Sequence, residues 1–188
     1  MSHTIAAIST PLGAGGIGVI RISGDDAIEI ANKIIVPSSG KPLSSLKGYS
    51  AAHGKAVSDG QALDECVALV FRAPKSYTGE DTVEISCHGG IYVTNRILRA
   101  VLDAGARPAE AGEFTKRAFL NGKLDLSEAE AVMDLIGARN ESAMKVALTA
   151  LEGALSKKID SLCSVLLSAS AHMGAWVDYP DDDIPDLD

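Results

Sequence analysis

The amino-acid sequence predicts an α+β fold, in which a mixed α/β domain is followed by a helical segment. Short β-branched apolar runs alternate with stretches of helical spacing as far as Ala109, and helical spacing dominates afterwards. The 188 residues are enough for a sizeable core. Because 46% of them are hydrophobic but only 4% are aromatic, we expect an aliphatic core.

The first elements follow from local composition. Residues 4–10 and 17–23 are short, apolar and β-branched, so we expect two strands around a glycine-rich turn. Apolar residues between Ala27 and Ile35 recur at helical spacing, and Ser23-Gly24-Asp25 offers capping oxygens in front of that helix. Residues 36–48 contain two prolines, two glycines and four serines, which predicts a loop.

A β-hairpin is expected next. Residues 49–57 and 62–71 flank Asp59-Gly60, a dipeptide that suits the positive φ angles of a tight hairpin turn. Residues 82–86 alternate as a further strand. A helix through residues 93–102 should then end at Gly105.

The second half reads as helices. Glu113–Leu120 predicts a short helix, and Ser127 with Glu130 three residues later predicts a capping box at the start of another. From Glu141 to Val177 apolar residues follow steps of three and four, which predicts one long helix that Pro180 ends. A homodimeric coiled coil, a bundle within this protein and a seat for a missing domain all fit that apolar stripe.

The charge pattern bears on the class of partner. The net charge is −8, but six aspartates lie within residues 178–188, and subtracting them leaves −2 for residues 1–177. A strongly basic nucleic-acid surface is therefore not expected. Three widely spaced cysteines without a CxxC motif, no apolar stretch of membrane-spanning length and no signal-peptide pattern favour a cytoplasmic protein with no membrane contact and no metal site.

Two glycine motifs need to be weighed. Gly13–Gly18 satisfies the G-x-G-x-x-G pattern of dinucleotide-binding proteins, but a β-branched strand follows it where that pattern requires a helix. A tight hairpin is the stronger explanation. Gly54-Lys55 lacks the spacing and the hydroxyl of a phosphate-binding loop, so this chain alone should not hydrolyse a nucleoside triphosphate.

Four side chains are candidates for binding or catalysis. Arg21 interrupts an apolar strand, which favours an anionic partner. Glu84 alternates with Val83 and Ile85, and would accept N–H donors of a heterocycle if it faced a pocket. Lys123 lies in a polar turn, where a solvated charge is the ordinary explanation. His88 ends a strand, but no nucleophile accompanies it, and no catalytic residue is assigned to this chain.

Several segments, in order along nearly the whole chain, resemble one family. They are Thr4-Ile5-Ala6-Ala7, Gly15-Gly16-Ile17-Gly18, Arg21-Ile22-Ser23-Gly24, Ser76-Tyr77-Thr78-Gly79-Glu80-Asp81, His88-Gly89-Gly90, the block from Gly112 to Leu126, Ala129-Glu130-Ala131, and the acidic segment from Val177 to Ile184. The chain is similar in them to the N-terminal region of the tRNA-modification GTPase family called MnmE or TrmE. It departs from the family at Ala14, often Arg there, and at Leu12, often Pro.

The resemblance implies a domain plan. Residues 1–120 would form an N-terminal folate-binding and dimerisation domain, similar to the folate-binding domain of aminomethyltransferases. Residues 121–188 would form the first part of a helical domain, and the chain would end before the expected insertion of the G domain. The GTP, Mg²⁺ and K⁺ sites of the full-length family would therefore be absent from this chain.

The resemblance also implies a ligand, partners and site residues. The family's folate-contacting residues correspond to Arg21, Glu84 and Lys123, and the expected cofactor is 5-formyl-tetrahydrofolate or a related one-carbon tetrahydrofolate. The N-terminal domains would form a homodimer. With MnmG, an FAD protein, the full-length protein would install a carboxymethylaminomethyl-type group at C5 of the wobble uridine of tRNA.

Two other functions remain open. The chain could be a structural dimerisation scaffold without a functional folate site. It could also be a free-standing one-carbon transferase, which would need a catalytic acid or base beside the folate, and His88 is the best candidate for that role.

Overall fold

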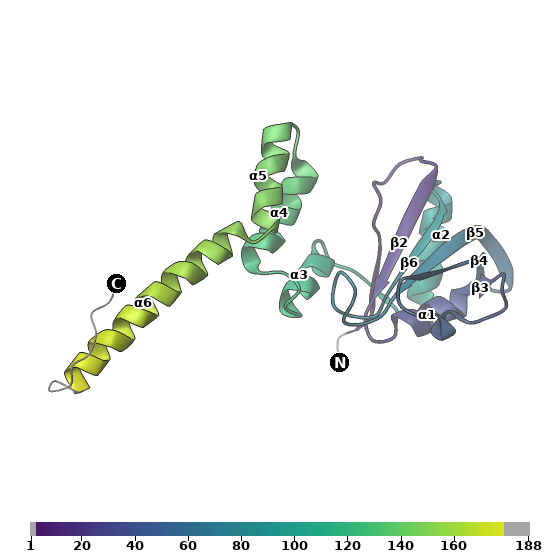
Figure 1. Cartoon of the computed structure of the whole chain (residues 1–188). Coiled ribbons are helices and arrows are strands. Elements are labelled where there is room, and N and C mark those ends of the chain that lie inside the picture. Colours follow the sequence, from purple (N-terminus) through teal and green to yellow (C-terminus); the bar gives the residue numbers. More distant parts are fainter. Residues whose placement is uncertain (1–2, 179–188) are drawn as a thin grey trace. The chain divides into compact units, whose positions relative to one another are not determined.

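The computed structural model describes residues 3–178 and divides the chain into two compact units (Figure 1). The division falls between Lys123 and Leu124, whereas the sequence places it after Leu120. The first unit is a mixed sheet with helices and the second is helical, which confirms the α+β prediction.

The first unit is built on a seven-stranded sheet in the order β3-β4-β5-β6-β2-β1-β7. Its neighbouring strands are antiparallel, except that β7 runs parallel to β1. The strands are β1 (Ile5–Ile8), β2 (Ile17–Ser23), β3 (Ile35–Pro37), β4 (Ser50–Ser58), β5 (Gln61–Phe71), β6 (Thr82–His88) and β7 (Arg107–Pro108). The expected loop over residues 36–48 thus begins in β3 and includes a 3-10 turn at Leu43–Ser45.

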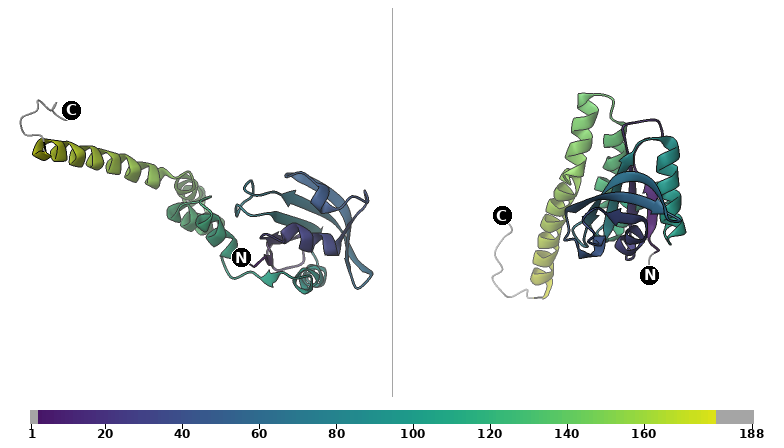
Figure 2. Two further views of the ribbon diagram at one scale, coloured as in Figure 1. Left: turned by 90° about the horizontal axis from the view of Figure 1, so that it is seen from below. Right: turned by 90° about the vertical axis from the view of Figure 1, so that its right-hand side faces the viewer.

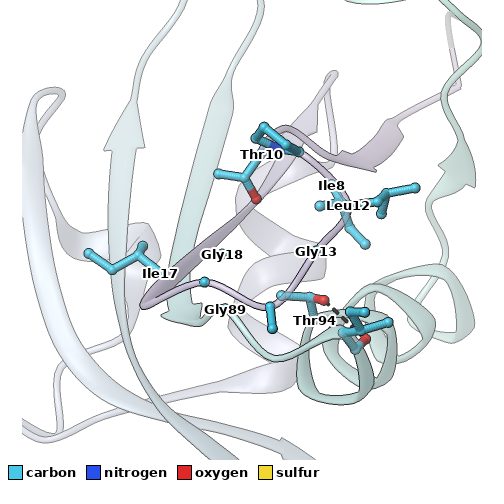
Figure 3. A pocket seen from close by; sticks show the side chains of 12 residues that line it. Ile8, Thr10, Leu12, Gly13, Ile17, Gly18, Gly89 and Thr94 are labelled. Atoms are coloured by element: carbon cyan, nitrogen blue, oxygen red, sulfur yellow. Dashed lines mark hydrogen bonds between the residues drawn. The ribbon is translucent and has the colours of Figure 1, made fainter.

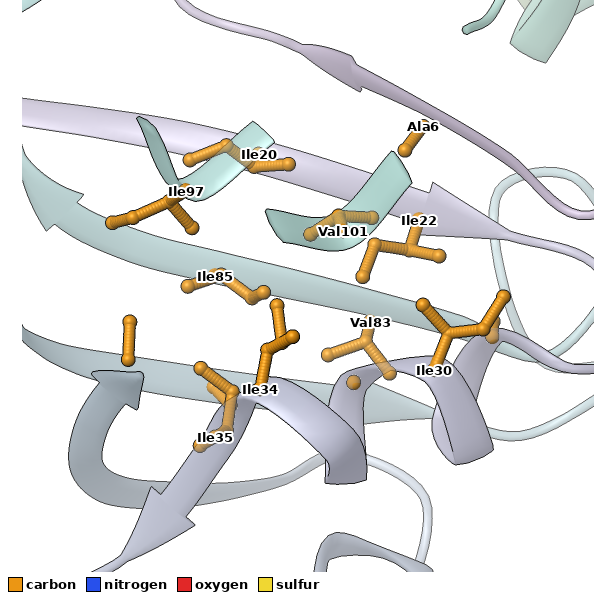
Figure 4. Packing of buried hydrophobic residues seen from close by; sticks show 14 of the residues in the cluster. Ala6, Ile20, Ile22, Ile30, Ile34, Ile35, Val83, Ile85, Ile97 and Val101 are labelled. Carbon is orange, nitrogen blue, oxygen red and sulfur yellow. The ribbon is translucent and has the colours of Figure 1, made fainter. Parts of the chain in front are cut away.

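The aliphatic core lies between the sheet and two helices, α1 (Ala27–Ile34) and α2 (Ile91–Asp103) (Figure 2). Figure 4 shows Ile30 and Ile34 of α1, together with Ile97 and Val101 of α2, packed over apolar side chains of β2 and β6. Those strand residues are fully buried: Ile20, Ile22, Val83 and Ile85. Because side chains alternate along a strand, the residues between them point to the other face of the sheet.

A hairpin turn and the start of a helix show how local backbone geometry and hydrogen bonds determine the path of the chain. Asp59 and Gly60 have φ angles of 51° and 76°, as a two-residue hairpin turn requires, and they join β4 to β5 as predicted. The predicted cap of α1 is wrong. Its N-cap is Asp26, which makes no side-chain capping bond, and the Asp26 N–H instead donates to Oγ1 of Thr4 at 3.1 Å.

The second unit contains α4 (Leu126–Gly137), α5 (Glu141–Leu151) and α6 (Ala154–Asp178). It follows α3 (Glu113–Leu120), the short helix of the first unit that the sequence predicts. Ala131 of α4 and Ala147 of α5 are both buried, since small side chains let these two helices pack closely.

Two predictions for the second unit are wrong. The capping box of α4 consists of Asp125 and Glu128, not Ser127 and Glu130, and Asp125 accepts an N–H bond from Glu128. The single helix from Glu141 to Val177 is instead two helices. Gly153 has a φ of 71° in the connection between them, and this left-handed conformation stops a helix in spite of continuous apolar spacing.

The apolar stripe of α6 has no buried residue within the described part of the chain, and Leu162, Leu166 and Leu167 are among its exposed members. Within residues 3–178, no helix combines the length and the apolar character that crossing a membrane requires. The predicted helix end at Pro180 and five of the six terminal aspartates lie outside the described residues.

Candidate functional site

Arg21 and Glu84 form an ion pair across two neighbouring strands. They lie directly opposite each other in the register of β2 and β6. Nε of Arg21 donates to Oε1 of Glu84 at 2.8 Å, and Nη2 lies 2.7 Å from the same oxygen. Their flanking residues are buried against the helices, so the pair lies on the opposite face of the sheet, as the alternation predicts for Glu84.

The ion pair remains accessible to a ligand. About a quarter of each side chain is exposed, 26% for Arg21 and 24% for Glu84. Among residues 3–178, neither Nη1 of Arg21 nor Oε2 of Glu84 has a hydrogen-bond partner. The pair therefore offers unused donors beside an unused acceptor, and both could bind a polar heterocycle.

Two aromatic rings contact the guanidinium of Arg21. Its Cζ lies 5.4 Å from the ring centre of Tyr77 and 5.5 Å from that of Phe114, which are cation–π distances. The Tyr77 hydroxyl also lies 2.9 Å from Oγ1 of Thr115. The sequence does not predict these two contacts, because neither leaves a periodic signal. The one clue in the sequence is that aromatic residues are rare, at 4% of the chain, which makes each of them a candidate for a specific contact.

Lys123 lies apart from the ion pair, on the neighbouring loop. Its Nζ donates to the carbonyl of Pro74 at 3.2 Å, and the side chain lines a cavity of about 670 Å³ with Gly79, Asp81 and Asn121. The structure thus brings Arg21 and Glu84 together but shows no contact between Lys123 and either of them. The loop of residues 72–81 links the two places, because it carries both Pro74 and Tyr77.

A buried charge network supports this loop from within the first unit. Arg117 of α3, only 9% exposed in its side chain, donates from Nη1 to both carboxylate oxygens of Glu80 at 3.0 and 2.9 Å. Glu80 also accepts from the hydroxyl of Ser23 at 2.7 Å. Arg117 reaches Glu113 as well, and Glu113 is further paired with Arg107.

The network changes the acidity of Glu113. Burial alone would raise the pKa of this carboxyl group, but hydrogen bonds from Arg107, from the backbone of Glu110 and from Arg117 outweigh it and lower the pKa to about 2. Three further acidic residues, on the loop of residues 72–81 and on β6, are paired in a similar way. Each of them, Glu80, Asp81 and Glu84, bonds to an arginine: Arg117, Arg72 and Arg21 respectively.

His88 is the last residue of strand β6, and its side chain pairs with an aspartate. Nδ1 of His88 lies 2.6 Å from Oδ1 of Asp64, and the His88 backbone N–H donates to Oδ2 at 2.7 Å. Burial alone would raise the pKa of Asp64, but the hydrogen bonds from His88 contribute to a net lowering of that pKa. His88 and Glu84 are four residues apart on one strand, roughly 13 Å along it. Within residues 3–178, no hydrogen bond joins His88 to a serine or cysteine side chain.

The glycine-rich turn forms a separate, mostly apolar pocket of about 260 Å³ (Figure 3). Gly18 lies inside strand β2 and does not begin a helix, so a dinucleotide-binding site of that type is excluded here, as the sequence context indicates. A Cβ on Gly18 would lie 2.3 Å from Cγ2 of Thr94, and one on Gly89 would lie 2.7 Å from the carbonyl oxygen of Gly15. These glycines permit close backbone packing.

Comparison with protein families gives two matches in chain order. Residues 4–123 match the family described as GTP-binding protein TrmE N-terminus, and residues 126–188 match the MnmE helical domain. The first match ends at the boundary between the two units, and it contains Arg21, Glu84 and Lys123.

Individual relatives give the same result. The chain is 49% identical over 183 residues to the tRNA modification GTPase MnmE of Carboxydothermus hydrogenoformans. This matched stretch covers 96% of this chain and 40% of the relative. It is 50% identical to the Geobacillus kaustophilus protein and 48% identical to the Bacillus subtilis protein of the same name, each over 187 residues, or 98% of this chain.

The chain spans about two fifths of the length of these relatives, 40% for the first two and 41% for the third. Both family matches, which together cover nearly all of the chain, and an identity of about one half lead to one conclusion. The chain belongs to the family of the tRNA modification GTPase MnmE, also called TrmE, and corresponds to the family's N-terminal region.

Proposed function

We propose that this chain is a tetrahydrofolate-binding and homodimer-forming part of a tRNA modification GTPase. The observation that carries the proposal is the partly exposed Arg21–Glu84 pair, with unused donors and an unused acceptor on one face of the sheet. It lies at two of the three positions that correspond to the folate contacts of the family.

The chemistry of the pair suits a pterin ring. A carboxylate accepts N–H bonds from the amino and ring nitrogens of the pterin, while a guanidinium donates to its carbonyl oxygen. Because the pair is held in register by two central strands, little rearrangement is needed when the ligand binds.

Lys123 would supply a third contact. Among residues 3–178, the carbonyl of Pro74 is the one hydrogen-bond partner of its exposed ammonium, and an anionic group of 5-formyl-tetrahydrofolate could replace it. Since the ammonium is solvated, its loss should weaken binding less than the loss of Glu84.

The activity of the whole protein follows as a wider proposal. The relatives are named tRNA modification GTPases. With MnmG, a full-length protein containing this chain would install a carboxymethylaminomethyl-type group at C5 of the wobble uridine of tRNA in the cytoplasm. GTP, Mg²⁺ and K⁺ would bind to other parts of that full-length protein.

Calorimetric titration with 5-formyl-tetrahydrofolate tests the proposal. The wild-type chain should bind, and Glu84→Gln or Arg21→Gln should weaken binding by about 1.5–3 kcal/mol, the usual loss of a charged hydrogen-bond partner. Glu65→Gln, at an exposed position on the neighbouring strand β5, serves as the matched control and should leave binding unchanged. Circular dichroism confirms that each variant is folded.

The scaffold alternative predicts a different result. A folded, dimeric wild-type chain that shows no heat of binding would overturn the folate proposal and leave a structural dimerisation module. Sedimentation alone does not separate the two functions, because both predict a dimer.

A further inference from the structure

Helix α6 carries an exposed apolar seam with the repeat of a coiled coil. The seam begins at Leu155 and continues at alternating steps of four and three residues through Ile159, Leu162, Leu166, Ala169, Met173 and Trp176. This spacing has the 3.5-residue period of two-stranded coiled coils over about three heptads. Apart from Ala169, the members of the seam are 46–69% exposed, so no other described part of the chain covers them.

The composition of α6 favours a protein surface as the partner of this seam. Residues 161–177 contain no aspartate, glutamate, lysine or arginine. A helix that lies on a membrane surface typically carries lysine and arginine along its polar face, and this part of α6 has neither. A second helix with a matching repeat would bury the seam in the usual way of coiled coils.

The two ends of α6 carry opposite charges. Lys157 and Lys158 lie within its first five residues, whereas Asp178 is its last residue and five further aspartates follow in the sequence. Each group has the sign that its own helix end disfavours, because the backbone dipole makes the start of a helix positive and its end negative. A partner helix that runs in the opposite direction would bring opposite charges together at both ends.

We propose that α6 forms an antiparallel coiled-coil contact with α6 of a second copy of this chain. The lysines at the start of one helix then face Asp178 at the end of the other. A parallel pair would instead place lysines beside lysines and aspartates beside aspartates, so charge determines the direction of the pair. The contact goes beyond the proposed function, because the homodimer proposed above is formed by the N-terminal domain.

Zero-length cross-linking tests this contact on an equal mixture of unlabelled and nitrogen-15-labelled 188-residue chains. A carbodiimide joins a lysine amine to a carboxylate only where the two groups touch. Within one α6, Lys158 and Asp178 are separated by about 30 Å along the helix axis, so a link between them forms only between two copies. We expect linked peptides of mixed isotope composition that join Lys157 or Lys158 to Asp178.

Two neighbouring leucines provide a matched pair of variants. Leu166→Gln places an amide in the seam and should lower the yield of the mixed link about fivefold. Leu167→Gln makes the same change at a 71% exposed position outside the repeat, and the yield should stay at the wild-type value. Circular dichroism should show the same helix content in both variants.

Two results would overturn the proposal: no mixed link in the wild type, or equal yields in the two variants. Either would leave the seam as a seat for a segment of a longer chain. Neither result bears on folate binding, which the calorimetric titration measures separately.

Discussion

Glu113 shows how single charged residues stabilise the site. Its side chain is only 7% exposed, and Arg107 and Arg117 both bond to it. Arg117 then bonds to Glu80, which lies on the loop with Tyr77. The carboxylate therefore neutralises the buried Arg117 and also pairs with Arg107, whose side chain is 40% exposed, so its loss takes one partner away from a buried charge.

We predict that Glu113→Gln lowers the free energy of unfolding at pH 7 by about 2–3 kcal/mol. The pKa of Glu113 is lowered from 4.5 to about 2 in the folded chain. Its stabilising contribution is therefore present above pH 4.5 and is lost as the pH falls from there toward 2. Urea unfolding at pH 7 and pH 2.5 should show a large gap between wild type and variant that narrows in acid.

The control for this prediction is Glu110→Gln, an exposed acid three residues earlier, which should change the stability little at either pH. An equal gap between wild type and Glu113→Gln at both pH values would contradict the role assigned to Glu113.

The sequence predicts part of the site at this scale. Alternation within a strand separates Arg21 and Glu84 from their buried neighbours, and so it indicates which face of the sheet they occupy. It does not indicate that they pair, because the register of β2 against β6 joins residues 63 positions apart. Tyr77 and Phe114 reach Arg21 through a loop and a helix, for which no short-range pattern exists.

At the scale of elements, local turn chemistry overrides apolar spacing. The stripe through Met144, Leu148 and Leu155 continues in helical steps across Gly153, yet the backbone there is left-handed and the helix ends. Strands β1, β2, β4, β5 and β6 and helix α2 agree with the sequence, because their breaks coincide with changes of period, whereas the short edge strands β3 and β7 are not predicted. The cap of α4 differs, because Asp125 and Glu128 satisfy the same S/T/D-x-x-E pattern two residues before Ser127.

Two glycine substitutions should have opposite effects on the helical unit. Gly153→Ala forces a side chain into the left-handed region and should lower the stability by about 1 kcal/mol. Gly174→Ala lies within α6 with no atom near the new Cβ, and should raise it by about 0.5–1 kcal/mol. Thermal unfolding followed at 222 nm measures both. A stabilising Gly153→Ala would show that the sequence favours one continuous helix.

At the scale of the whole molecule, the exposed apolar surface of the first unit bears on the proposed homodimer. Leu12, Ile17 and Ile91 line the pocket of the glycine-rich turn and are 81%, 67% and 55% exposed. Apolar side chains gathered in this way commonly mark an interaction surface.

If the proposed homodimer uses this surface, Leu12→Asp should shift the chain from dimer to monomer in sedimentation velocity, because it would place a charge in an apolar interface. Val36→Asp, at an exposed position on the edge strand β3, is the matched control and should remain dimeric. A dimer that survives Leu12→Asp would place the interface on another surface of the chain.

The most direct test of the central claim maps the ligand onto the chain. Backbone and arginine side-chain NMR signals are recorded while 5-formyl-tetrahydrofolate is added to the 188-residue protein. We predict that the largest shifts occur at Arg21, Tyr77 and Glu84, with smaller shifts at Lys123. Shifts confined to residues 13–18 and 89–94 around the glycine-rich pocket, or no shifts at all, would contradict the account.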